Sequence, residues 1–596
     1  MRLLNCVFCV ISIVRISAAR EQHFVTDPIA SSRARVAAAE SRIVCPGSDG
    51  RLVYKAINER GDRIIDFSSV GYMGGGVRIP DVPVRLVLKP GGRGTDDGAR
   101  IQAAIDSIAS LPIDGSGFRG AIFLKRGRYV CSRVLTIAAN GIVLRGEGDG
   151  PEGTCLVDGV REKNDFISIT GSGSLEEIPG SRVNIVDDYV PVGSFVVHVS
   201  DGSGFSPGDK VCVDRPGTKE WLRVLGTDNL PKDFPDVKDW TPEQYHLRWE
   251  RTIVSIRGTA ITLDAPIVDA LNKRLGQSSL YKYAYEGRVS QIGIENLRLE
   301  SVFDDTVKRP VTLELIRDGL NGARSQDDLE SVHADENHGW AAVRFEAAEN
   351  CWVRNVTSKS FGYSCVMITA SAKYVTVQDC TCLDPVSLVY GGRRYSFYVN
   401  GQLNLVQRCY SRQGRHDFVL AARTCGPNVF LDCVAEQSWS MNEPHHRWSQ
   451  GGLWDNVVAV GPWACLQAVN RSSSGTGHGW AGVNMVFWNC DAKCIFIQEP
   501  PTGQNFSIGR IHTLPYVYRW SFEEDRDEMV AWIEFHAKKK FPYEKEATVI
   551  GDGYIEYPTS TVTPRSLYLQ QLKDRLGMEA VRNVTTEEQR RKFFGD

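Results

Sequence analysis

The sequence predicts an all-β protein built as a parallel β-helix, in which the chain winds into stacked coils of short strands. A repeat of about 22–25 residues supports this fold, as does the frequent Gly and Asn-Gly punctuation of short strands joined by turns. At 596 residues the chain is long enough to bury a large core. The formal net charge of −3, from 69 basic and 72 acidic residues, argues against a nucleic-acid-binding protein that works through bulk charge.

The first 19 residues predict a secretory signal peptide. Arg2 gives a basic start, an apolar stretch covers residues 3–14, and small residues precede a cleavage point near Ala19. The apolar stretch is shorter than the roughly 20 residues that span a bilayer. We therefore expect a secreted, extracellular protein that does not use a membrane, with an N-terminal extension over residues 20–63. Asn-x-Ser/Thr triplets fit a secreted glycoprotein; they lie at Asn355, Asn470, Asn505 and Asn583.

Residues 64–174 are expected to form the N-terminal cap and first coils. In "GGRGTDDGARIQAAIDSIAS", Asp96 and Asp97 are placed to cap a helix, because their carboxylates accept the free N–H groups of its first turn. An apolar face follows at helical spacing, from Ile101 to Ile108. Strands separated by glycine turns come next, in "AIFLKRGRYV" and "LTIAANGIVLRGEG".

Over residues 88–150, the "DD…IQ.AID" helix and the later "G..Y" and "L.G.G" turns resemble the N-terminal cap of the pectate-lyase-like superfamily. With the later coils, the resemblance extends over most of the chain. It implies a right-handed parallel β-helix closed by an N-terminal helix. It does not fix the chemistry, because the superfamily includes lyases, hydrolases, epimerases and binding proteins. Superfamily lyases often use calcium, but we find no tight acidic cluster here and expect no metal or other cofactor.

Three further regions follow. Residues 175–285 interrupt the coil and are expected to form a small antiparallel β subdomain with one short helix. Residues 286–510 resume the coil and carry the candidate site. Residues 511–596 lose the repeat, and "SLYLQQLKDRLG" predicts a helical C-terminal cap that protects the last coil edge.

The repeat is clearest where four triplets open successive units. They are "HGW" at His338, "FGY" at Phe361, "RRY" at Arg393 and "RHD" at Arg415, and their spacings are 23, 32 and 22 residues. A second strand in each unit ends in a polar residue followed by valine or cysteine. We expect the cysteines at this point to stack inside the coil as small apolar residues rather than form disulfides or reactive thiols; they are Cys380, Cys409 and Cys433.

Stacked triplets would place their side chains in a column about 4.8 Å apart per coil. The column mixes arginine, histidine and tyrosine, which suits an acidic sugar chain because arginine pairs with carboxylates and aromatic rings pack on sugars. The candidate catalytic residues are His416, Arg394, Arg415 and Tyr395. The candidate substrate-binding residues are Arg393, Tyr398, Arg412, His338, Asp417, His445, His446, Trp448 and His478.

The favoured function is a polysaccharide lyase that cleaves a uronate-containing polymer by β-elimination. Arg393, Arg394 or Arg415 would neutralise the uronate carboxylate, and His416, oriented by Asp417, would take the proton. Tyr395 or Tyr398 would then protonate the leaving oxygen.

Two alternatives remain open at this point. A glycoside hydrolase on the same fold would use two carboxylates about 5–9.5 Å apart, and the candidates are Asp335, Glu336, Asp417, Glu443 and Asp455. The paired motifs of the polygalacturonase branch are missing, although "GHG" occurs at His478. A non-catalytic carbohydrate-binding β-helix is the second alternative. In each case the partner is a polysaccharide and we expect a monomer.

Overall fold

The computed structural model describes residues 38–92, 94–311, 330–460, 465–492, 494–511 and 549–595. The predicted signal peptide, residues 1–19, lies outside the described residues, as do residues 20–37 of the predicted extension and 512–548 of the predicted cap region. No helix of the described part is long and apolar enough to cross a membrane.

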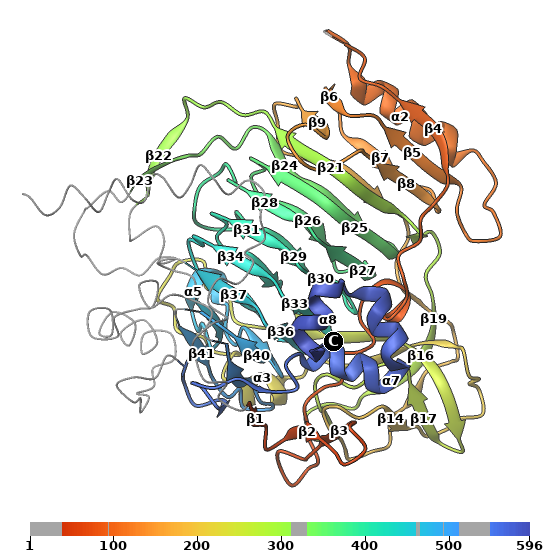
Figure 1. Ribbon diagram of the computed structural model, residues 1–596. Helices are drawn as coiled ribbons and strands as arrows, with labels where there is room; N and C mark the ends of the chain where they lie inside the picture. Colours follow the sequence, from red (N-terminus) through yellow and green to blue (C-terminus); the bar gives the residue numbers. More distant parts are fainter. Residues whose placement is uncertain are drawn as a thin grey trace, which may run out of the picture. The chain divides into compact units, whose positions relative to one another are not determined.

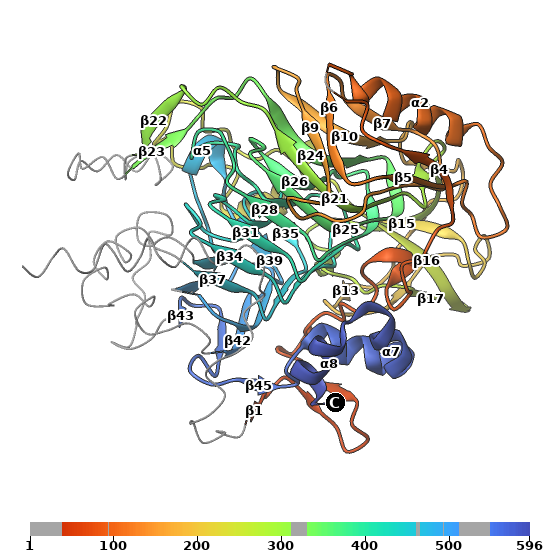
Figure 2. The same ribbon diagram turned by 45° about the horizontal axis from the view of Figure 1, so that its top comes forward.

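The chain forms a right-handed parallel β-helix whose coils carry three lines of strands (Figures 1 and 2). The first line comprises β4 (Val84–Leu88), β5 (Gly120–Leu124), β8 (Ile142–Arg145), β21 (Gly293–Ser301), β25 (Ala348–Lys359), β27 (Lys373–Gln378), β30 (Leu405–Gln407), β33 (Asn428–Leu431), β36 (Gly452–Asp455), β40 (Val486–Cys490), β42 (Phe506–Arg510) and β44 (Tyr554–Glu556). The second line comprises β6 (Gly127–Cys131), β9 (Thr154–Asp158), the ends of β21 and β25, β28 (Thr381–Leu383), β31 (Tyr410–Arg412), β34 (Val434–Glu436) and β37 (Val458–Val460).

The third line carries the candidate site. It comprises β7 (Leu135–Ile137), β10 (Asn164–Thr170), β24 (Gly339–Glu346), β26 (Ser364–Ile368), β29 (Phe397–Val399) and β32 (Phe418–Leu420). Two isolated bridges, from Leu420 to Pro444 and from Asn442 to Leu466, carry the line onward to β38 (Leu466–Ala468) and β41 (Ile495–Ile497). The third line therefore extends beyond its six-stranded sheet.

One residue in each coil turns the chain from the first line to the second, and its identity explains the polar residue of the repeat. These residues all have φ between 49° and 57°, the left-handed region that asparagine and aspartate enter more readily than most residues. They are Asn296, Asn355, Asp379, Arg408, Asp432, Asn456 and Asn489. The residue that follows each corner points inward, so the prediction that Cys380, Cys409 and Cys433 stack in the core is confirmed. All fourteen cysteines of the described part are free thiols.

The N-terminal cap is the helix α2 (Asp97–Ala109). Asp96 is its N-cap and accepts a hydrogen bond from the Gly98 N–H at 3.0 Å. Ile101, Ile105 and Ile108 are buried against the first coils. The helix thus covers the apolar interior that the first coil would otherwise expose, as the sequence predicted.

The inserted subdomain lies between β10 and β21 and is an antiparallel sheet with one short helix, α3 (Lys219–Leu225). Its strands are β11 (Glu176–Glu177), β12 (Val183–Asn184), β14 (Val196–His198), β15 (Lys210–Arg215), β16 (Leu247–Arg257), β17 (Ala260–Leu263) and β19 (Ser279–Ala284). A buried ion-pair network joins the subdomain to the coil. Glu250 of β16 meets the guanidinium of Arg288 at 2.7 and 2.9 Å and the ammonium of Lys373 at 2.8 Å.

The C-terminal helical cap consists of α7 (Leu567–Val584) and α8 (Glu587–Phe594) (Figure 2). Its hydrogen bonds reach several coils, at Gln407, Asp432 and Asp455. Gln589 of α8 accepts a hydrogen bond from Arg408 at 2.6 Å. The start of α7 is anchored by Asp455 of β36, which accepts hydrogen bonds from Ser566 Oγ at 2.7 Å and from the Tyr568 N–H at 2.9 Å.

The two ends of the described chain are joined beside this cap. β1 (Ala39–Glu40) pairs in parallel with β45 (Val562–Thr563). Arg42 Nε lies 2.7 Å from Glu556 Oε1, and the Leu52 N–H donates to Asp574 at 2.8 Å.

The anchor at Asp455 predicts a pH dependence of stability. Burial raises the pKa of this carboxyl to about 7, although hydrogen bonds from Ser566 and Tyr568 act against the rise. The folded state therefore holds the proton more tightly than the unfolded state does. The stability that this group contributes is full below about pH 4 and is lost as the pH rises to about 7, up to about 4 kcal/mol at about 1.4 kcal/mol per unit.

We expect the stability difference between the wild type and Asp455→Asn to fall by that order between pH 4 and pH 7, measured by urea unfolding at each pH. A difference that stays constant over this range would show that Asp455 keeps an ordinary pKa.

The predicted glycosylation triplets differ in exposure. Asn505 is fully buried, and its amide donates to the carbonyl oxygens of Gly482 at 3.1 Å and Gln498 at 2.9 Å. Asn355 is exposed. When the protein is made in a eukaryotic secretory host, we expect glycopeptide mapping to find a glycan at Asn355 and none at Asn505. Folded protein that carries a glycan at Asn505 would contradict the packing of this residue.

Candidate active site

The four triplets that open the repeats do stack. Backbone hydrogen bonds join neighbouring triplets: Tyr363 N–H donates to Trp340 O at 2.8 Å, Arg394 N–H to Gly362 O at 3.2 Å, and Arg415 N–H to Arg394 O at 2.8 Å. They lie at the start of the third line, where each coil enters β24, β26, β29 or β32. The predicted column therefore exists in the backbone, although its side chains point in different directions.

One face of the third line carries a ladder of side chains that are half-buried except for the last, Val419, which is fully buried. Arg344, Met367, Tyr398 and Val419 are register partners in successive strands. Tyr363 and Tyr395 lie beside this ladder, with their ring centroids 5.1 Å apart, and Trp340 stacks on Tyr363 at 5.7 Å. These aromatic rings form a continuous strip, which we call the aromatic strip; it consists of Trp340, Tyr363, Tyr395 and Tyr398.

At one end of the aromatic strip, three side chains form a hydrogen-bonded chain. The Tyr395 hydroxyl lies 3.1 Å from His445 Nε2, and His445 Nδ1 lies 2.6 Å from Glu443 Oε1. Glu443 is fully buried, whereas Tyr395 and His445 are each 5% exposed. The coil repeat brings them together: Tyr395 precedes β29, and Glu443 and His445 flank the bridge residue Pro444 two coils later.

The charges fix the direction of the protons in this chain. A carboxylate has no proton to give, so His445 Nδ1 is the donor in its contact with Glu443. Burial, with Arg471 next in importance, lowers the pKa of His445 well below its usual value, so the imidazole is neutral and Nε2 carries a lone pair. The Tyr395 O–H therefore donates to His445 Nε2. The order is Tyr395 to His445 to Glu443, which is the arrangement by which a base activates a hydroxyl group.

Buried cations surround this chain. Arg471 Nη1 lies 3.0 Å from Glu443 Oε1 and donates to the His445 carbonyl oxygen at 2.8 Å. Arg415 Nη1 lies 3.4 Å from the Tyr395 hydroxyl. The side-chain amide nitrogen of Gln467 also donates a hydrogen bond, to Glu443 Oε2. A negative charge that develops on Tyr395 would thus be stabilised by Arg415.

His416 belongs to the same cluster. Its ring lies 5.1 Å from the Tyr395 ring and 4.5 Å from the His445 ring. Its Nδ1 atom lies 2.5 Å from the Met441 carbonyl oxygen and must donate there, and it also lies 3.3 Å from Glu443 Oε1. Burial, followed by the charge of Arg415, lowers the pKa of His416 well below its usual value.

His416, Glu443 and His445 are spaced like metal ligands, with one donor atom each within 4.8 Å of one another. Calcium does not fit this set, because it prefers six to eight oxygen ligands and only one carboxylate is present. A transition metal would meet the guanidinium of Arg471, 2.9 Å from His445 Nδ1. We therefore derive no chemistry through a metal.

The remaining predicted residues lie in several places. His446 and His478 are half-buried next to His445, with ring centroids 4.8 and 5.2 Å from it, and desolvation lowers the pKa of both; that of His446 falls to about 3. Arg393 forms a bidentate pair with Glu336 at 2.6 and 3.0 Å. Arg412 lies on β31 of the second line and pairs with Asp384 at 2.9 Å.

Four predictions need correction. Arg394 is 1% exposed and its guanidinium donates to main-chain carbonyl oxygens, among them Ser387 O at 2.7 Å; burial lowers its pKa to about 9. His338 is fully buried, 2.8 Å from Ser301 Oγ and 2.9 Å from Val386 O. Both side chains form hydrogen bonds to neighbouring segments of the chain, so they hold loops in place and are not available to a substrate.

The other two corrections concern Asp417 and Trp448. Asp417 does not orient His416; it points into the coil and accepts hydrogen bonds from three serine hydroxyls. Trp448 packs at the inserted subdomain, where its indole N–H donates to Asp269 at 2.8 Å. Both side chains are thus committed to partners outside the Tyr395–His445–Glu443 chain.

Sequence reasoning missed Arg471 and Gln467. A usable signal existed, because Gln467 follows Glu443 by one repeat of 24 residues and therefore lies next to it on the third line. Glu443 itself was considered only as a hydrolase carboxylate.

No protein-family model matches this sequence, and no curated protein matches it. Among solved structures, the chain is similar to the tailspike protein gp49 of Pseudomonas phage LKA1, with 11% identity, a TM-score of 0.35 and coverage of 69% of this chain and 62% of that one. It is also similar to the tailspike protein of E. coli bacteriophage HK620, solved with a pentasaccharide, with 10% identity, a TM-score of 0.33 and coverage of 71% and 54%. The chain thus spans less than two thirds of the length of these tailspikes. The resemblance to the pectate-lyase-like superfamily stays a prediction beyond the β-helix itself.

Proposed function

We propose that this protein is a secreted polysaccharide lyase that cleaves a uronate-containing polymer by β-elimination, with Tyr395 as the base. The observation that carries the proposal is the chain of hydrogen bonds from the Tyr395 hydroxyl through His445 to Glu443. A tyrosine linked in this way can give its proton to the imidazole when substrate binds and so act as a base near neutral pH.

In the proposed step, the Tyr395 oxygen takes the proton from the carbon next to the uronate carboxylate. The electron pair of that C–H bond forms a C=C bond, and the bond from the neighbouring carbon to the glycosidic oxygen breaks. The leaving oxygen then takes a proton from Tyr395, and His445 returns its proton to the tyrosinate, so the enzyme ends as it began. His445 holds the tyrosine proton during the step, and Glu443 stabilises the imidazolium that forms.

This assignment changes the roles expected from the sequence. Tyr395 replaces His416 as the base, because the Tyr395 hydroxyl is linked through His445 to Glu443, whereas the Nε2 atom of His416 is buried and has no partner within the described chain that could relay a proton. Arg415 replaces Arg394 as the cation beside the reacting groups, since Arg415 Nη1 is 3.4 Å from the Tyr395 hydroxyl.

The aromatic strip supports a carbohydrate substrate. Trp340 and Tyr398 are half-buried, so part of each ring faces outward along the third line and can pack on sugar rings. Lys163 lies 4.2 Å from the Trp340 ring and shares the carboxylate of Glu336 with Arg393, so these three side chains leave a net positive charge beside the strip.

The carboxylates favour a lyase over a hydrolase. A hydrolase needs two carboxylates that face one sugar bond. Asp417 and Asp455 are fully buried and held by serine hydroxyls, and Glu336 is paired with Arg393 and Lys163. Of these candidates, Glu443 is the one that lies in the cluster around Tyr395.

The test uses purified protein and a panel of acidic and neutral polysaccharides. We expect acidic polymers to yield products with the ultraviolet absorbance of an unsaturated uronate, and neutral polymers to yield none. New reducing ends without that absorbance would show hydrolysis instead, and binding without any product would show a carbohydrate-binding protein.

A further inference from the structure

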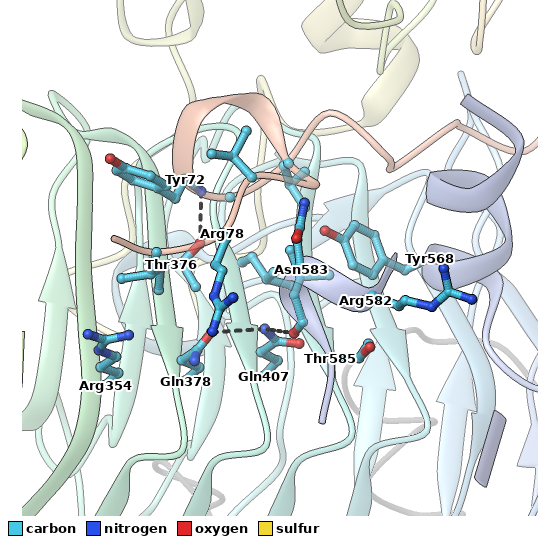
Figure 3. Close-up of a pocket in the computed structure, with 17 residues that line it drawn as sticks. Tyr72, Arg78, Arg354, Thr376, Gln378, Gln407, Tyr568, Arg582, Asn583 and Thr585 are labelled. Atoms are coloured by element: carbon cyan, nitrogen blue, oxygen red, sulfur yellow. Dashed lines mark hydrogen bonds between the residues drawn. The ribbon is translucent and has the colours of Figure 1, made fainter. Parts of the chain in front are cut away.

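A pocket lies on the first line, apart from the Tyr395 site (Figure 3). Its volume is about 370 Å³, which lies within the usual range for small-ligand sites. Three distant segments build it: residues 70–79 around the short helix η1 (Tyr72–Gly74), the outer faces of β25, β27 and β30, and α7, through Tyr568 at its start and residues 582–585 at its end. The pocket exists only because the C-terminal helix folds back onto the coil.

The pocket is basic. Its lining includes Arg78, Arg354 and Arg582 and no aspartate or glutamate. Arg354 is paired with Glu295 at 2.9 Å. Arg78 and Arg582 are exposed, and neither forms an ion pair within the described residues. Two guanidinium groups are thus available to an anion, and arginine suits carboxylates because it can donate two parallel hydrogen bonds.

Two buried polar atoms in the lining lack partners within the described residues. Gln407 is fully buried; its amide nitrogen donates to Val584 O at 2.9 Å and to Gln378 Oε1 at 3.2 Å, while its Oε1 atom has no partner within the described chain. The hydroxyl of Tyr568, also fully buried, is likewise unpaired there. A buried polar atom without a partner costs about 1–3 kcal/mol, so a ligand hydroxyl that reached Gln407 Oε1 would remove this cost.

We propose that this pocket binds a small hydroxylated anion of the uronate type, a single sugar acid. Its carboxylate would pair with Arg78 and Arg582, a hydroxyl would donate to Gln407 Oε1, and the sugar ring would lie against Tyr72 and Leu405. Because the lining joins η1, the coil and the end of α7, the bound sugar acid would also hold the C-terminal helices to the coil. This site is independent of the chemistry proposed at Tyr395.

The experiment measures binding by calorimetry with the full chain and glucuronate, glucose and inorganic phosphate as probes. We expect glucuronate to bind and the other two to bind at least about tenfold more weakly, since each lacks one of the two recognised groups. Arg582→Gln and Arg78→Gln are each expected to weaken glucuronate binding about tenfold. Arg257→Gln, an exposed arginine on the inserted subdomain, serves as the matched control and should bind as the wild type does.

Equal binding of glucose would overturn the role of the arginines, and equal binding of phosphate would overturn the role of the hydroxyl contact. Binding that survives both arginine substitutions would place the ligand elsewhere on the protein. As a second readout, glucuronate should raise the melting temperature of the wild type and of Tyr395→Phe alike. A rise in the wild type that is lost in Tyr395→Phe would place the sugar acid at the Tyr395 site and overturn the proposed pocket.

Discussion

Replacing Tyr395 by phenylalanine is expected to lower kcat for an acidic polysaccharide by about 10³-fold, because a positioned acid–base group contributes about 10²–10⁴-fold to a rate. The substitution removes only the hydroxyl that contacts His445 Nε2 and keeps the ring in the aromatic strip. The fold and substrate binding should change little. Product absorbance gives kcat and KM, and circular dichroism checks the fold.

Tyr363→Phe is the matched control for this prediction. Tyr363 lies in the same strip with its ring 5.1 Å from Tyr395, and no hydrogen bond joins it to His445 or Glu443 within the described residues. We expect its kcat to stay within a few-fold of the wild type, because the loss of an acid–base group would have a far larger effect. If Tyr395→Phe retained full activity, the relay through His445 would not be the catalytic unit.

The largest loss of stability is expected for Glu250→Gln, which removes the charge from the network that joins the inserted subdomain to the coil. Burial alone would raise the pKa of Glu250, but Lys373 and Arg288 hold it well below the usual value. The substitution leaves these two buried cations without their main carboxylate partner. Breaking a buried ion pair from one side costs about 3–5 kcal/mol.

Urea unfolding followed by tryptophan fluorescence measures this loss. The control is Glu243→Gln, an exposed glutamate of the same subdomain, which should lie within about 0.5 kcal/mol of the wild type. A Glu250→Gln protein as stable as this control would mean that the subdomain is held to the coil by its apolar contacts alone.

The fold could be predicted from the sequence because each coil repeats the same local requirements. The polar residue at 379, 408 or 432 takes the left-handed corner, and the cysteine after it enters the core. These requirements act within one repeat, so they are visible as a period. The pairing of the chain ends and the packing of α7 against the coil depend on contacts between residues more than 500 positions apart. Such contacts leave no repeating pattern in the sequence from which they could be predicted.

The candidate site could be predicted only in part. The stacked triplets correctly brought Tyr395, Arg415 and His416 together, since backbone position follows from the repeat. Side-chain direction does not follow from it: Arg394 turns to the carbonyl oxygen of Ser387, in the loop that precedes it. The role of Glu443 was hidden because its partner His445 lies two residues away, on the far side of a proline.

The joined ends change how this solenoid should come apart. In an open stack each coil touches only its neighbours, so a terminal coil can fray while the middle stays intact. Here the strand pair β1–β45 and the ion pair of Arg42 with Glu556 connect the first described segment of the chain to the last. The N-terminal segment cannot separate without breaking contacts of the C-terminal segment, so we expect these two segments to open together.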